Sequence, residues 1–150
     1  MITTETLSQF GLFNGLPESL LSEIAAICSE TSYKNDEYVF REGETADKLH
    51  LLLKGSVALR VKLTSRPESV TVSFISTPFQ SFGWSGVVPP FHYTSSAQCD
   101  EDSELLTIPA APFMKILEKN SDSGFKVMQR VAIIIADRLR NSHQALLKTI

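Results

Sequence analysis

The distribution of apolar residues divides the chain into a helical start, a strand-rich middle and a helical end. Within Pro17–Ser29 the apolar residues recur at helical spacing, and Pro17 and Glu18 are typical of a first helical turn. An apolar segment over 12–16 precedes this run, and we expect it to pack on the strands that follow. The pattern therefore predicts an N-terminal helix that is held against a β-rich body.

Short runs of alternating apolar and polar residues fill the middle of the chain, roughly residues 31–109. Tyr33–Phe40 and Lys48–Leu63 are rich in β-formers, and Gly43 and Gly55 lie where a hairpin needs positive φ. Further runs with a strand period are Val70–Phe74, Thr94–Cys99 and Glu104–Ile108. This succession predicts an antiparallel barrel or sandwich of about eight strands, each with one buried face.

The chain returns to helical patterns over residues 110–148. Pro112–Lys119 predicts a short helix, and Asn120–Ser123 offers several N-cap residues for a long helix that reaches about Lys148. Apolar residues on this helix repeat in steps of four and three, the spacing of a coiled-coil seam. The seam residues are Met128, Val131, Ala132, Ile135, Leu139 and Leu146.

Two interpretations of this seam remain open. It either packs only on the chain's own barrel or also pairs with a second copy. Val127, Ile133 and Ile134 add a second apolar flank, so that one side of the helix can face the barrel and the other a partner. We expect this helix to form a homodimer. The alternative is that the same face of the helix binds a separate partner protein.

Composition and charge narrow the class of protein. Hydrophobic residues make up 43% and charged residues 21%, as in an ordinary globular protein of one domain. The net charge of -3 argues against a general nucleic-acid or anionic-membrane surface. Cys28 and Cys99 read as reduced, half-buried thiols, with a disulfide or redox switch as the other interpretation. Without a signal peptide or an apolar run near ~20 residues, the chain is expected to be cytoplasmic and not membrane-spanning.

The sequence offers no motif for catalysis or for metal binding. It contains no nucleophile elbow, no Walker loop and no paired acid–base carboxylates placed by a motif, so we do not expect an enzyme. His50, His92 and His143 are widely spaced and lack further ligands at metal-site spacing. The expected functions are therefore binding and regulation.

The order of the predicted elements, together with several short motifs, resembles the cyclic nucleotide-binding domain. The motifs are Arg41–Glu44 with Asp47 and Leu49–Leu53, then Phe82-Gly83 with Gly86–Val88, then Asp100–Glu104 before Leu105–Ile108. The resemblance implies a single domain over 1–150 with a jelly-roll (double-stranded β-helix) barrel over roughly 31–109. It also implies an N-terminal helix and C-terminal helices over 110–148, as in the sensor domains of catabolite-activator and Fnr-type regulators. Because the sequence ends at Ile150, we expect no DNA-binding helix-turn-helix in it.

The resemblance also locates a phosphate-binding cassette, and there the sequence departs from the family. In the family a Glu contacts the ribose and an Arg neutralises the cyclic phosphate. Here Trp84 takes the position of the Glu, and Tyr93 or His92 that of the Arg, as in a bacterial subgroup that also reads Trp-Ser. Each charge-assisted hydrogen bond contributes ~1.5–3 kcal/mol, so the loss of two lowers affinity by about two to four orders of magnitude.

The resemblance implies a ligand pocket between the cassette and the long helix. The candidate contacts are Phe82, Gly83, Trp84, Ser85, Gly86, His92, Tyr93, Thr94, Ser96 and Arg138. Trp84 is either a stacking lid or a residue that fills the ribose volume, and His92 and Tyr93 are either pocket contacts or part of a surface loop. Arg138 either caps the pocket mouth or lies on the surface.

Two functions follow from these observations. The first is a small-molecule-sensing regulatory domain that is not an ordinary cyclic AMP receptor. No cofactor is assigned, and its ligand is either a cyclic nucleotide or another small anion. The alternative is a ligand-free dimerisation or protein-interaction module with a plugged pocket.

Overall fold

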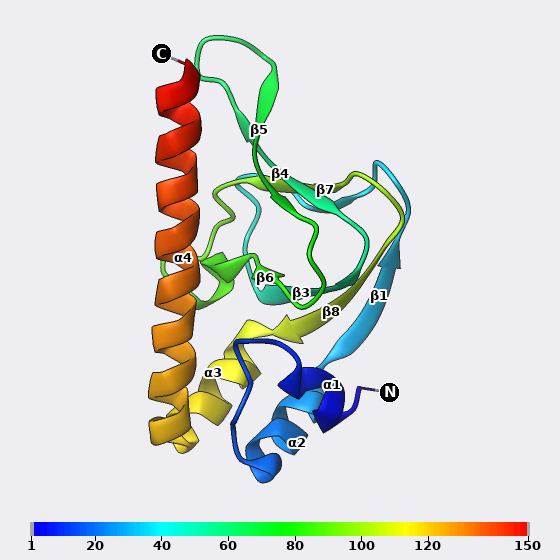
Figure 1. Cartoon of the computed structure of the whole chain (residues 1–150), viewed down its shortest axis with the longest axis vertical. Helices are drawn as coiled ribbons and strands as arrows, with labels where there is room; N and C mark the ends of the chain where they lie inside the picture. The colour runs from blue at the N-terminus through cyan, green and yellow to red at the C-terminus, as the bar shows by residue number, and fades with distance from the viewer. Residues whose placement is uncertain (1, 150) are drawn as a thin grey trace.

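Two four-stranded antiparallel sheets form the centre of the computed structural model, which describes residues 2–149 (Figure 1). The first sheet has the order β1-β8-β3-β6 and the second β2-β7-β4-β5. The strands are β1 (Ser29–Tyr33), β2 (Tyr38–Phe40), β3 (Lys48–Lys54), β4 (Val57–Lys62), β5 (Ser69–Ile75), β6 (Ser81–Phe82), β7 (Ser96–Cys99) and β8 (Ser103–Pro109). The predicted jelly roll is confirmed, as two facing sheets whose strands, over the described residues, do not join into one closed barrel.

Helices cover one end and one side of the two sheets. The helices are α1 (Thr4–Ser8), α2 (Glu18–Ile27), the 3-10 turn η1 (Trp84–Val87), α3 (Ala110–Lys119) and α4 (Ser121–Thr149). In Figure 1, α1, α2 and α3 gather beneath the first sheet, while α4 runs along the side of both sheets toward the β4–β5 hairpin. The sequence pattern predicted α2, α3 and α4 but not α1, which is a single short segment capped by the Thr3 side chain.

Two hydrophobic clusters hold these layers together. The outer cluster packs α1, α2, α3 and the start of α4 on the first sheet, and the inner cluster fills the space between the sheets. Strand β3 contributes to both, because alternate residues point to opposite faces: Leu49 and Leu51 face the helices, whereas Leu52 faces the inner cluster. Both faces of β3 are therefore buried, which explains its nearly continuous apolar sequence.

Strand β5 departs from the predicted half-buried pattern. Of the three alternating residues, Val70 and Phe74 are exposed and Val72 packs partly against the inner cluster, whereas Ile75 at the end of the strand is buried in it. The register against β4 shifts between Leu59 and Arg60, so one residue of β5 is skipped and the alternation is broken. The prediction that Val70–Phe74 presents a single buried apolar face is therefore wrong.

The two cysteines are free thiols, as the sequence predicted. Cys99 is buried, and Cys28 is half-buried with its thiol donating to the Ile24 carbonyl. Burial raises the pKa of Cys28 to about 12, so this thiol is not poised for reaction as a thiolate.

Candidate ligand-binding site

The segment that corresponds to the cassette turns sharply after β6. Gly83 has a φ of 77°, a left-handed conformation that glycine adopts without strain. A Cβ atom at this position would lie 2.8 Å from His50 Cδ2, so space as well as backbone geometry requires glycine. The turn leads directly into η1, which positions Trp84 and Ser85 beside α4.

A cavity of about 290 Å³ lies between this turn, the segment before β7 and α4. Its walls are Phe40, Leu59, Gly83, Trp84, Ser85, Val88, Tyr93, Thr94, Ser95, Ile135 and Arg138. Six of the ten residues that the sequence indicated as ligand contacts are among them: Gly83, Trp84, Ser85, Tyr93, Thr94 and Arg138. The cavity therefore lies where the resemblance expected a pocket.

The other four candidates have different surroundings. Phe82 is buried in the inner cluster, and Gly86 packs tightly against α3, where an added Cβ would lie 3.2 Å from Ala110 Cβ. His92 is exposed, and the Ser96 hydroxyl accepts a hydrogen bond from the Glu42 amide at 2.9 Å. None of these four residues lines the cavity.

Several wall residues were not among the candidate contacts. Phe40 on β2 and Leu59 on β4 come from strands far from the cassette in sequence, and Ile135 was assigned to the helical seam. Their strand and helix patterns marked them as apolar positions. No sequence signal indicated that these positions meet the cassette.

Tyr93 is a structural residue of the inner cluster and only 6% exposed. Its ring stacks on Phe40, with the centroids 3.7 Å apart and the planes 5° from parallel. Its hydroxyl donates to the Lys48 carbonyl at 3.1 Å and lies 3.2 Å from His50 Nε2. Burial, the largest cause, raises the pKa of Tyr93 to about 12. The surface-loop interpretation is therefore wrong for Tyr93, although the adjacent His92 is exposed.

His50 is the buried partner of Tyr93. It is 3% exposed, and burial, reinforced by the positive charge of Lys48, lowers its pKa to about 4. Because the one hydroxyl proton of Tyr93 goes to the Lys48 carbonyl, we assign Nε2–H of the neutral ring as the donor to Tyr93 Oη. His50 Nδ1 is then a buried acceptor that has no hydrogen-bond partner among the described residues.

A second cavity, of about 420 Å³, lies on the other side of the Phe40–Tyr93 stack. Phe40 and Tyr93 line both cavities, whereas His50 lines only the second. The stacked pair is thus shared by the walls of both cavities.

Trp84 belongs to the outer cluster although it also lines the cassette cavity. It is 6% exposed, and its indole Nε1 has no hydrogen-bond partner among the described residues. A tryptophan with this burial contributes packing to the core. The structure therefore favours a packing role for Trp84, here in the outer cluster, over that of a stacking lid.

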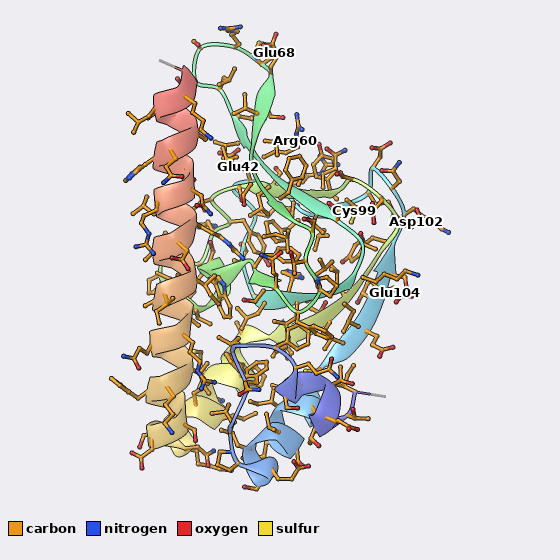
Figure 2. All side chains as sticks on the ribbon, viewed as in Figure 1. Glu42, Arg60, Glu68, Cys99, Asp102 and Glu104 are labelled. Carbon is orange, nitrogen blue, oxygen red and sulfur yellow. The ribbon has the colours of Figure 1, made fainter. Side chains whose placement is uncertain are left out.

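Arg138 is the one charged side chain in the described walls of the cassette cavity. It extends from α4 to donate a hydrogen bond to the Ser81 carbonyl, and burial lowers its pKa to about 10. Over residues 2–149, no carboxylate lies within ion-pair distance of it. The labelled acids Asp102 and Glu104 point outward on the side of the sheets away from α4 (Figure 2).

The helical seam divides into a buried and an exposed part. Val131 is 2% exposed and packs in the outer cluster, and Met128 is partly buried against the same cluster. The expectation that Val131 lies in a dimer interface is therefore wrong, because its own domain covers it. The seam residues that remain exposed are Ala132, Ile135, Leu139 and Leu146.

The described residues contain neither a membrane-spanning helix nor a metal-binding cluster. Across 2–149, each helix is too short or too polar to cross a bilayer. In the same range, no three His, Cys, Asp or Glu side chains are grouped as a metal ion would require.

Comparison with known proteins agrees with this architecture. The family model of the cyclic nucleotide-binding domain matches residues 30–120, and the chain belongs to this family. Members of the family are regulatory sensor domains. The resemblance drawn from the sequence motifs is thus confirmed.

The relatives differ in how much of their own length this chain covers. A structure of a cyclic nucleotide-binding type protein from Geobacter metallireducens GS-15 is 33% identical, with a TM-score of 0.80, and covers 93% of this chain and 99% of that one. "Glutaminase 1" of Bradyrhizobium diazoefficiens is 27% identical over 139 residues, which are 91% of this chain and 21% of that protein. A CRP-like cAMP-activated global transcriptional regulator of Mycobacterium tuberculosis is 27% identical over 93 residues, 62% of this chain and 41% of that protein. The chain thus spans between a fifth and two fifths of these curated relatives.

Proposed function

We propose that this domain is a small-molecule-sensing regulatory module and not an ordinary cyclic AMP receptor. The observation that carries the proposal is the cavity whose walls come from the cassette turn on one side and from α4 on the other. A ligand in this cavity contacts Gly83 and Ser85 as well as Ile135 and Arg138. Binding that favours one position of α4 over another shifts the population of the two, and the helix carries the signal.

The side chains of the cassette support a ligand other than cyclic AMP. Trp84 brings an indole where the family has the ribose-binding Glu, and Tyr93 brings a neutral, hydrogen-bonded phenol near the position of the phosphate-binding Arg. Loss of two charge-assisted contacts lowers affinity by about two to four orders of magnitude. We therefore propose at most weak binding of cyclic AMP in a cytoplasmic regulatory protein.

Ligand binding is testable with the chain's single tryptophan. Trp84 lines the cavity, so an occupant changes its fluorescence. A ligand at about ten times its Kd stabilises the fold by about 1.4 kcal/mol, which raises Tm of a domain this size by about 3–6 °C. We expect at least one member of a panel of cyclic nucleotides, nucleosides and aromatic carboxylates to produce both effects. Absence of both effects across the panel at millimolar concentration would contradict ligand sensing.

One observation favours the alternative, a ligand-free interaction module. The Phe40–Tyr93 stack fills the space between the sheets and is anchored by hydrogen bonds to Lys48 and His50. In that case the domain acts through α4 alone, and the panel leaves both Tm and Trp84 fluorescence unchanged. The same experiment thus separates the two functions.

We also propose a homodimer formed through the exposed part of α4. Leu139 and Ile133 are equally exposed, at 56%, but Leu139 lies in the seam whereas Ile133 faces the groove beside β5. We expect Leu139→Lys to convert the dimer to a monomer in light scattering, because a charge in an apolar seam is unpaired. Ile133→Lys is the matched control and is expected to remain dimeric. A monomeric wild-type chain, or loss of the dimer in both variants, would count against this interface.

A further inference from the structure

The cassette cavity contains an arginine whose hydrogen-bonding capacity is mostly unused. A guanidinium carries five N–H donors, and among residues 2–149 Arg138 makes one hydrogen bond, from Nη2 to the Ser81 carbonyl. The nearest acid in sequence, Asp137, is paired instead with Arg140 on the exposed side of α4. Arg138 is therefore a half-desolvated cation that lacks a counter-charge among residues 2–149.

The remaining walls of the cavity are of two kinds. Hydroxyl groups come from Ser85, Thr94 and Ser95, and every one of these can donate a hydrogen bond. Apolar surface comes from Phe40, Leu59, Trp84, Val88 and Ile135. At about 290 Å³ the cavity is just below the usual size range of ligand sites, so it suits a small ligand. One cation, a few donors and an apolar wall fit a small ligand that has an anionic end and a flat apolar body.

From this arrangement we propose that Arg138 is the anion contact of the site and that its ligand is a small amphipathic anion. The inference rests on the proposed sensing function and narrows it to a ligand class. The Ser81 carbonyl accepts one hydrogen bond from the guanidinium. The anionic group, a carboxylate or a phosphodiester, accepts charge-assisted hydrogen bonds from the other N–H groups. The positive charge that the cassette lacks is thereby supplied by α4.

This placement couples recognition directly to the long helix. The Arg138–Ser81 hydrogen bond ties α4 to β6, the strand that precedes the cassette turn. A carboxylate or phosphodiester attracts a guanidinium more strongly than a neutral carbonyl does. An anion bound by the free N–H groups therefore competes with the Ser81 carbonyl for the guanidinium, and this competition shifts the position of α4 relative to the sheet.

Two pairs of probes separate the charge of a ligand from its shape. Benzoate and benzamide differ mainly in the carboxylate, and cyclic AMP and adenosine differ in the phosphodiester. Dissociation constants measured by calorimetry are expected to favour the anionic member of at least one pair by about tenfold to a hundredfold. Preference for benzoate identifies a carboxylate ligand, and preference for cyclic AMP a phosphodiester ligand.

Variants of the two neighbouring arginines test the assignment. Arg138→Gln is expected to reduce the preference to about twofold or less while the affinity for the neutral member is unchanged. Arg138→Lys keeps the charge but not the planar fork, so we expect an intermediate preference and an intact fold. Arg140→Gln, which removes an exposed and paired charge on the same helix, is the control and is expected to behave as wild type.

The outcomes distinguish this inference from the proposed function. If the wild-type protein binds both members of each pair equally, or if Arg138→Lys and Arg138→Gln keep the full preference, Arg138 is not the anion contact although ligand sensing stands. If no probe up to about 10 mM changes Tm or Trp84 fluorescence, both the inference and the sensing function are overturned. Loss of preference in Arg138→Gln with retention in Arg140→Gln supports both.

Discussion

Lowering the pH from 6.5 to 4 will reduce the unfolding free energy of the wild-type domain by about 3 kcal/mol more than that of a His50→Gln variant. The cause is the buried ring of His50, whose pKa burial lowers from 6.5 to about 4. Between these values the unfolded chain binds a proton at this residue and the folded chain does not. Stability therefore rises with pH through this window and is lost as the pH falls.

Urea denaturation at several pH values between 7 and 4 measures this effect. The wild-type curve is expected to lose up to about 1.4 kcal/mol per pH unit more than the variant curve, because all carboxylates are common to the two proteins. The Gln amide can still donate to Tyr93 Oη, so the comparison isolates the titration of the imidazole. Parallel pH profiles of the two proteins would show that His50 is not held neutral by the fold.

Replacing Trp84 by alanine is expected to destabilise the domain by about 3–5 kcal/mol. The indole is 6% exposed and joins η1 to the outer cluster that packs α1, α2 and α3 on the first sheet. Its removal exposes apolar surface and leaves a cavity that the rigid strands cannot fill. Chemical denaturation followed by circular dichroism gives the free energy without relying on the lost fluorophore.

Trp84→Phe is the matched control and is expected to cost about 1 kcal/mol, because it keeps an aromatic ring and removes the unpartnered indole N–H. If Trp84→Ala were as stable as wild type, Trp84 would be a surface lid and not a core residue. A Glu at this position, as in the family, cannot be reinstated without the loss of the same packing.

The helices and strands themselves were largely determined by local sequence. The helical stripe within 17–29 and the alternation around Gly55 each need only neighbouring residues to specify an element. Gly55 has a φ of 110°, as its place in a hairpin predicted. The departure at β5 arose because a register shift against β4 is a property of two strands and not of one.

Local patterns do not predict which of two neighbouring residues is buried. His92 and Tyr93 are adjacent, yet one is exposed and the other stacks on Phe40 inside the fold. In an extended segment neighbouring side chains point to opposite faces, but the local sequence does not show which face packs against the rest of the protein. Phe40, which stacks on Tyr93, lies far away in sequence, and only the packing of the folded sheets brings the two rings together.

The sequence by itself determined the family, the order of the elements and the absence of the family's charged residues from the cassette. The tertiary structure decided which side chains share a cavity, and it separated Arg138, turned toward Ser81, from Arg140, exposed two residues later. Helical periodicity places residues 138 and 140 on different faces, but the identity of the inner face depends on how α4 packs on the sheets. That packing is a sum of contacts between distant segments, and no local pattern encodes it.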